Sequence, residues 1–170
     1  MNRRVGYTVG YQGADPDTVA IAAREVGVTT IVDTRRHPTS RRPAFRREAL
    51  RRRLAEHGIA YRSEPRLGVP TRLRPLAASR PWLFQAAYRG VLSRSPDALE
   101  QTVHLARRET IALLCFESEP GQCHRSLLAA AISSAAPIDF RDLDVRRVQD
   151  TDDHPGLPLV MGPQDQMKIP

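Results

Sequence analysis

Five side chains that can do chemistry fall within eleven residues of the chain. They are Cys115, Glu117, Cys123, His124 and Arg125. Thiols, carboxylates and imidazoles serve proteins as nucleophiles, acids and bases, and a cysteine beside a histidine and an arginine at a helix start has a lowered thiol pKa. The pattern predicts a catalytic group: Cys123 is a nucleophile or redox thiol, Glu117 the acid or base, and Cys115 and His124 their neighbours.

Each of these residues also has a structural explanation. Cys123 can fill a tight corner between a strand and a helix while His124 points to water. Cys115 ends an apolar run, and cysteine is among the residue types most often buried in cores. Glu117 can hold Arg125 in place rather than meet a substrate. A regulatory or structural protein with inert core cysteines is therefore an open alternative.

The same segment has the pattern of an anion-binding site. The apolar run that ends at Cys115 is followed by a short loop and by a helix predicted over residues 122–136. Free backbone N–H groups and the dipole of a helix N-terminus favour negative charge, and Arg125 can add a bidentate contact to a phosphate or carboxylate. Arg125 and the following Ser126 are therefore predicted to bind substrate.

A second group of polar residues follows another apolar, β-branched run. Asp33 and Arg35 stand at its end, and Arg41 follows in a loop that contains prolines. Gly10 and Tyr11 hold the corresponding place after the first apolar run. Because ligands of parallel sheets bind beyond the carboxyl ends of the strands, these five residues are also predicted to bind an anionic substrate.

Short apolar runs alternate with segments of helical periodicity along the chain. Strands are predicted at residues 5–9, 28–32, 59–62 and 110–115, with a last one at 137–140 or 143–145, and helices at 18–26, 45–57, 82–92, 96–108 and 122–136. Ser95 is expected to cap the helix at 96–108, and residues 65–81 to be irregular. The alternation predicts an α/β fold, a three-layer sandwich around a mostly parallel sheet. A single domain covers residues 1–148, and an irregular C-terminal tail covers 149–170.

The positive charge of the chain is concentrated in one segment. The 170 residues include 26 basic and 19 acidic ones, and every basic residue except Lys168 is an arginine. Thirteen arginines lie between Arg35 and Arg74 beside three glutamates, which gives this segment a charge of +10 against +7 for the chain. Codon bias on a solvated helix face is one explanation. The other is an anionic partner: a small molecule in a pocket or, alternatively, a nucleic acid bound without catalysis along the Arg35–Arg74 surface.

Several familiar active-site patterns are missing. The chain has no Cys-x-x-Cys pair, no cysteine followed after five residues by arginine, no G-x-x-x-x-G-K-[ST] loop and no G-x-G-x-x-G turn. Cys115, Glu117, Cys123 and His124 offer enough donor atoms for zinc, but the adjacent Cys123 and His124 are expected to diverge at a helix start. The sequence therefore predicts no metal and no cofactor.

The chain shows no signal for a membrane or for export. No apolar stretch approaches the length of a membrane span, and the first residues lack the apolar run of a signal peptide. We therefore expect a cytoplasmic protein without membrane contact, in which Cys115 and Cys123 are thiols. The sequence does not set the oligomeric state.

Several short motifs follow one another in an order typical of one bacterial family. They are Tyr7-Thr8-Val9-Gly10-Tyr11-Gln12-Gly13, Val32-Asp33-Thr34-Arg35 with Pro38-x-Ser40-Arg41 and Phe45, Leu67-Gly68, and Cys115-Phe116-Glu117 with Cys123-His124-Arg125-Ser126. In this ordered set, over residues 4–140, the chain resembles the family catalogued as domain of unknown function 488. The resemblance implies a compact α/β domain with motif positions at 33–41 and 115–125, and it supplies no reaction. The chain departs from the family pattern at two positions. Thr34 stands where valine is more usual, and Val69 stands where the family pattern has a second glycine.

Overall fold

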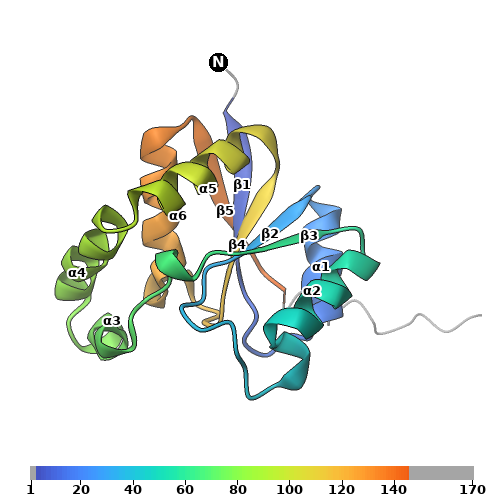
Figure 1. Cartoon of the computed structure of the whole chain (residues 1–170), viewed down its shortest axis with the longest axis horizontal. Helices are drawn as coiled ribbons and strands as arrows, with labels where there is room; N and C mark the ends of the chain where they lie inside the picture. Colours follow the sequence, from blue (N-terminus) through green and yellow to red (C-terminus); the bar gives the residue numbers. More distant parts are fainter. Residues whose placement is uncertain (1–2, 146–170) are drawn as a thin grey trace, which may run out of the picture.

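A five-stranded parallel sheet forms the centre of the protein, seen in a computed structural model that describes residues 3–145 (Figure 1). Its strands are β1 (Arg4–Gly10), β2 (Thr30–Asp33), β3 (Ala60–Ser63), β4 (Ile111–Cys115) and β5 (Ile138–Leu143). They lie in the order β3-β2-β4-β1-β5, and every neighbouring pair is parallel. The predicted α/β class is confirmed, and the sheet of the described residues is wholly rather than mostly parallel.

Helices cover both faces of the sheet. Helices α1 (Pro16–Glu25) and α2 (Arg47–Glu56) pack on one face, and α4 (Pro81–Ser93), α5 (Pro96–Arg108) and α6 (His124–Ala135) pack on the other (Figure 1). A short helix, α3 (Arg74–Ser79), precedes α4. These layers are the predicted sandwich. Within residues 3–145, no helix has both the length and the apolar character needed to cross a bilayer.

Two local predictions are corrected by the structure. Residues 65–81 are not irregular: they contain two short 3-10 helices, Pro65–Leu67 and Thr71–Leu73, and α3. Prolines stand in the first turns of these helical segments or just before them, where the N–H that proline lacks has no helical partner. Ser95 occupies the N-cap position of α5, but its side chain makes no capping hydrogen bond. The predicted tail at 149–170 lies outside the described residues.

The central strands alternate their side chains between two apolar cores. Along β4, Ile111 and Leu113 pack against the α4, α5 and α6 side, while Ala112 and Leu114 pack against the α1 and α2 side. Every residue of β2 and β4 is buried. Such apolar runs are typical of parallel strands covered on both faces. The buried strands β2 and β4 therefore hold the loops that follow them in fixed positions.

The carboxyl ends of β1, β2 and β4 meet at one edge of the sheet. Gly10 pairs with Cys115, and Asp33 pairs with Leu114. The chain leaves β1 toward α1 on one face and leaves β4 toward α6 on the other. A crevice forms where neighbouring strands send their connections to opposite faces, and the predicted site segments lie at this edge.

Candidate functional site

A cavity of about 760 Å³ opens at the carboxyl edge of the sheet. Its lining combines a buried reactive group with exposed cations. The buried or half-buried members include Tyr11, Arg35, Cys115, Glu117, Cys123 and His124, and the exposed cations are Arg36, Arg41, Arg42 and Arg74. Seven of the eleven residues predicted to form the site therefore share one cavity: both cysteines, Glu117, His124, Tyr11, Arg35 and Arg41.

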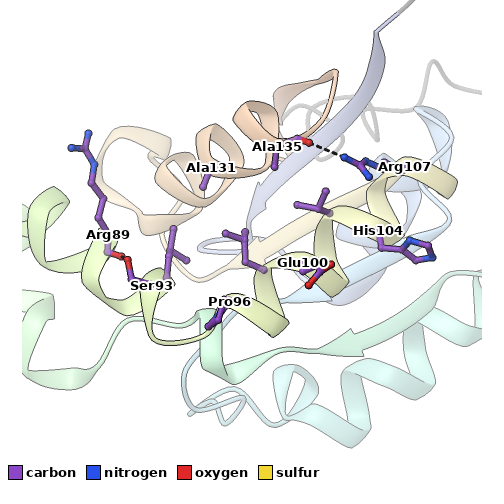
Figure 2. A pocket seen from close by; sticks show the side chains of 11 residues that line it. Arg89, Ser93, Pro96, Glu100, His104, Arg107, Ala131 and Ala135 are labelled. Atoms are coloured by element: carbon purple, nitrogen blue, oxygen red, sulfur yellow. Dashed lines mark hydrogen bonds between the residues drawn. The ribbon is translucent and has the colours of Figure 1, made fainter.

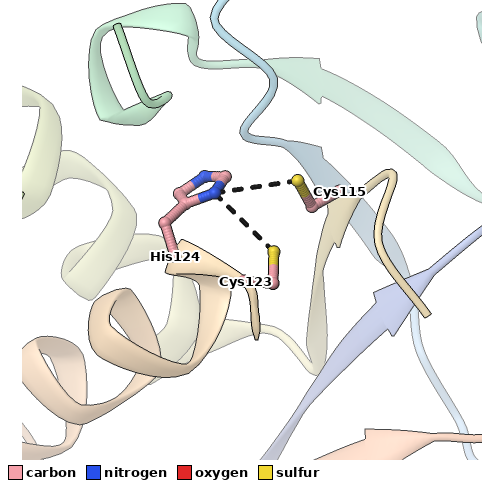
Figure 3. A group of neighbouring side chains, drawn as sticks. All are labelled: Cys115, Cys123 and His124. Carbon is pink, nitrogen blue, oxygen red and sulfur yellow. Dashed lines mark hydrogen bonds between the residues drawn. The ribbon is translucent and has the colours of Figure 1, made fainter. Parts of the chain in front are cut away.

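The two thiols and the imidazole face one another at the buried end of this cavity (Figure 3). Nδ1 of His124 lies 3.7 Å from the Sγ of Cys115 and 3.7 Å from the Sγ of Cys123. The expectation that Cys123 and His124 diverge is therefore wrong. Cys123 keeps an extended backbone (φ −120°, ψ 144°) just before α6, whereas His124 is already helical. The turn between these conformations brings both side chains to the same point.

His124 is fixed in orientation by its other ring nitrogen. Nε2 lies 3.3 Å from the carbonyl oxygen of Thr34, and the ring of Tyr88 packs edge-on against the imidazole with the centroids 5.3 Å apart. Because a carbonyl oxygen can only accept a hydrogen bond, Nε2 carries a hydrogen. Nδ1 therefore faces the two sulfurs: it donates to a thiolate when it carries a hydrogen, and it offers a lone pair when it does not.

The two cysteines have opposite electrostatic environments. The pKa of Cys123 is lowered, mainly by the neighbouring Cys115 thiol and to a smaller extent by His124. The Cys123 sulfur, burial and the Glu117 carboxylate raise the pKa of Cys115. The Sγ of Cys115 donates to Oε2 of Glu117 at 2.9 Å. The pair therefore holds one thiolate, at Cys123, and one thiol, at Cys115.

Arg35 forms one wall of the cavity and is held by Asp33. Two bonds join the side chains, Nε to Oδ1 at 2.8 Å and Nη2 to Oδ2 at 2.5 Å, and the hydroxyl of Tyr61 also donates to Asp33 at 2.6 Å. Nη1 of Arg35 donates to the hydroxyl of Tyr11 and to the carbonyl of Phe45, each at 2.9 Å. Burial opposes the charge of Arg35, but the Asp33 carboxylate overrides it, and the net result is a raised pKa of Arg35.

Asp33 therefore supports the site without lining it. Its carboxylate is fully buried, with an exposed fraction of 0%, against 6% for Arg35. Tyr11, whose hydroxyl Arg35 also contacts, stacks on Phe45 with the ring centroids 4.0 Å apart. The predicted role of Asp33 as a substrate ligand is corrected to a positioning role, because Arg35 and Tyr61 already occupy its oxygens.

Arg125 and Ser126 also position the site rather than line it. The guanidinium of Arg125 is completely buried and donates to the carbonyl of Glu117 and to that of Ser118, the latter at 2.8 Å. The hydroxyl of Ser126 donates to the carbonyl of Pro120 at 2.6 Å. Both predicted substrate contacts are corrected, since these side chains fix the loop between β4 and α6 and so fix Glu117.

Gly10 leaves room for that loop. A Cβ atom at this position would lie 1.8 Å from the carbonyl oxygen of Glu117. The predicted substrate-binding role of Gly10 is therefore corrected to a steric one, because the backbone of the reactive loop passes directly over it.

Replacing Gly10 with alanine is expected to lower the free energy of unfolding by about 1–3 kcal/mol, as overpacking a well-filled site does. The clash is with backbone, which cannot rotate away as a side chain can. Urea unfolding followed by circular dichroism measures the loss. Gly121→Ala in the same loop is the matched control, because no atom lies within 4 Å of its added Cβ. Equal stability of both variants would contradict the close contact.

Several lining residues lie outside the eleven residues that were predicted to form the site. Arg36 and Arg42 belong to the basic loop already singled out, and Arg42 stacks over the ring of Phe45 at 4.8 Å. The density of arginines around Arg41 is the sequence signal for both. Arg74 and Phe84 come from α3 and α4, a region whose sequence shows no motif that ties it to the cysteines.

A second cavity, of about 580 Å³, lies between α4, α5 and α6 (Figure 2). Its lining is mainly apolar and includes the polar side chains of Arg89, Glu100, His104 and Arg107. Arg107 is already engaged, because its Nη2 donates to the carbonyl of Ala135 at 2.8 Å. Neither cysteine borders this cavity, so the cavity at the carboxyl edge is the candidate functional site.

The fold and the site define a class: a wholly parallel α/β protein with a thiol–imidazole–carboxylate cluster inside an arginine-rimmed cavity. The sequence profile described as Domain of unknown function DUF488 matches residues 16–132. The protein belongs to this family, as its resemblance predicted. Comparisons with curated proteins and with solved structures gave no match. The matched region includes both cysteines, His124 and the Asp33–Arg35 pair.

Proposed function

We propose that this protein is an enzyme that binds a phosphate-bearing or nucleotide-like anion in the carboxyl-edge cavity and acts on it with Cys123. One observation carries the proposal: a single cavity joins the buried cluster of Cys115, Cys123, His124 and Glu117 to a rim of exposed arginines. Arginine matches the geometry of phosphate and carboxylate oxygens. The cations would therefore place an anionic group over the sulfur.

The rim supplies charge that the protein itself does not neutralise. Among the described residues, no ion pair joins Arg41, Arg42 or Arg74 to a carboxylate, whereas Arg53 and Arg66 outside the cavity are both paired with acids. Arg35 adds a fixed cation to the cavity wall. A bound anion would complete the electrostatic balance of the rim.

In the proposed reaction the Cys123 sulfur forms a bond to an electrophilic atom of the bound substrate. The leaving group departs with the electron pair of the broken bond and takes up a proton. The Cys115 thiol, whose Sγ donates to Oε2 of Glu117 at 2.9 Å, would supply this proton. Water or a second acceptor then takes the group from the sulfur, which leaves with the electron pair of the S–substrate bond and returns as the thiolate, while the proton lost by the attacking acceptor returns to the Cys115 sulfur. These two steps are those of a cysteine-dependent hydrolase or transferase, and two free thiols suit the reducing cytoplasm that we propose as its location.

Binding of inorganic pyrophosphate, measured by isothermal titration calorimetry, tests the anion site. Arg41→Ala/Arg42→Ala is expected to weaken binding at least about tenfold, because each charge-assisted hydrogen bond contributes about 1.5–3 kcal/mol. The matched control is Arg51→Ala/Arg52→Ala, which removes the same charge from exposed positions of α2 outside the cavity. Equal weakening in both variants would show that net charge, not the cavity, binds the anion.

A nucleic-acid-binding module is the second candidate, favoured by the exposed arginines of α2. Arg47 and Arg52 on this helix are exposed, but Arg51 and Arg53 are paired with acids, Arg51 with Glu48 at 2.9 Å. This candidate predicts that the Arg51→Ala/Arg52→Ala variant loses affinity for a DNA duplex and that the affinity of the unaltered protein falls steeply with salt. Titration of a fluorescent duplex with both double variants separates the two candidates.

A further inference from the structure

We propose that Cys115, Cys123 and His124 form a binding site for one Zn²⁺ ion, and that the ion reversibly blocks the thiol chemistry of the cavity. The blocking effect rests on the function proposed above, whereas the binding of the metal does not. The three donor atoms all lie within 4.8 Å of one another, on side chains that are each buried.

The sulfur–nitrogen separations match the edges of a zinc tetrahedron. Bond lengths of about 2.3 Å to sulfur and about 2.0 Å to nitrogen, at a tetrahedral angle, put sulfur and nitrogen about 3.5 Å apart and two sulfurs about 3.8 Å apart. Nδ1 of His124 lies 3.7 Å from the Sγ of each cysteine. The three donor atoms, all within 4.8 Å of one another, can therefore surround one ion.

The imidazole is oriented as a metal ligand requires. Metal-binding histidines nearly always donate their second ring N–H to a carbonyl or carboxylate, which fixes the tautomer. Nε2 of His124 faces the carbonyl oxygen of Thr34 at 3.3 Å, and Nδ1 faces both sulfurs (Figure 3). The coordinating lone pair is thus aimed at the place where the ion would lie.

Charge favours the metal at this buried position. Two thiolates placed side by side without an ion would repel each other. A Zn²⁺ ion bound to two thiolates and a neutral imidazole has no net charge. Neutral groups are far less costly to bury than charged ones. The burial that hinders two thiolates therefore does not hinder the zinc complex.

The fourth position of the ion would face the cavity. All three ligands line it, together with Glu117, and zinc sites with three protein ligands keep a position for water or another oxygen donor. Because both sulfurs are then ligands, neither is free to attack a substrate. The zinc-bound protein is thus the blocked state and the metal-free protein the reactive one.

Titration of the chelator-treated full-length chain with Co²⁺ and with Zn²⁺ tests the site. We expect one Co²⁺ per chain with sulfur-to-metal charge-transfer absorption and tetrahedral d–d bands, displaced by one Zn²⁺. Cys123→Ser and His124→Ala are each expected to weaken binding by at least about 100-fold, since loss of a direct ligand exceeds the effect of losing its supporting partner. His104→Ala, on the exposed surface of α5, is the matched control and should leave binding unchanged.

Absence of one-to-one binding in the unaltered chain, or binding that survives His124→Ala, would overturn the inference. Alkylation of Cys123 by iodoacetamide distinguishes a failure of the zinc-site inference from a failure of the proposed function. If zinc binds but Cys123 of the metal-free chain does not react, the metal site is supported and the role of Cys123 as nucleophile is contradicted. If Cys123 reacts and zinc neither binds nor slows the reaction, only the metal site is contradicted.

Discussion

Replacing Asp33 with alanine will lower the free energy of unfolding by about 3–5 kcal/mol, the range seen when one partner of a buried ion pair is removed. Asp33 accepts from the backbone N–H, Nε and Nη2 of Arg35 and from the hydroxyl of Tyr61. Its loss would leave a buried guanidinium with only the Tyr11 hydroxyl and the Phe45 carbonyl as partners. Urea unfolding measures the change.

Two further variants isolate the cause. Adding Arg35→Met to Asp33→Ala removes the unpaired charge and should recover a large part of the lost stability. Glu56→Ala breaks an exposed pair with Arg53, which contributes little because water screens it, so its unfolding midpoint should not change. If Asp33→Ala unfolds like Glu56→Ala, the Asp33–Arg35 pair does not lie in a buried environment.

Replacing Cys123 with serine will abolish rapid alkylation of the metal-free protein at pH 6. The pKa of Cys123 is lowered by the Cys115 thiol and His124, so its sulfur stays a thiolate below the pH at which an ordinary cysteine takes up a proton. An ordinary thiol with a pKa near 8.5 loses about 100-fold in reactivity between pH 8 and pH 6. Cys123 should lose far less, because it remains ionised across that range.

Mass spectrometry after iodoacetamide treatment, in the presence of a chelator, measures the rate at each cysteine separately. Cys115 should stay unmodified at pH 6, because its pKa is raised by the Cys123 sulfur, by burial and by Glu117. Cys115→Ser should make the reaction of Cys123 more pH-dependent, because it removes the largest influence that lowers its pKa. Rapid modification of Cys115 rather than Cys123 would reverse the assignment of thiol and thiolate.

The sequence predicted the place of the site because strand ends are predictable. Apolar, β-branched runs end at Asp33 and Cys115, and the carboxyl ends of parallel strands share one edge of a sheet. Residues that follow these runs were therefore expected to meet. The cavity confirms this for Cys115, Cys123, His124, Arg35 and Tyr11.

The direction of individual side chains was not predictable in the same way. Arg125 looks like a phosphate ligand by its position at a helix start, but it donates to carbonyls of its own loop. The convergence of Cys123 and His124 depends on one backbone change at Cys123, which residue types alone do not encode. Arg74 and Phe84 reach the cavity only because α3 and α4 pack beside it, a contact between segments distant in the sequence.

The most direct test of the account is protection of Cys123 from iodoacetamide by inorganic pyrophosphate in the metal-free protein. We expect that pyrophosphate slows alkylation of Cys123 to a saturable limit, that Arg51→Ala/Arg52→Ala keeps this protection, and that Arg41→Ala/Arg42→Ala loses it. Pyrophosphate that binds the unaltered protein but leaves the alkylation rate of Cys123 unchanged would contradict the claim that the anion lies over the reactive sulfur.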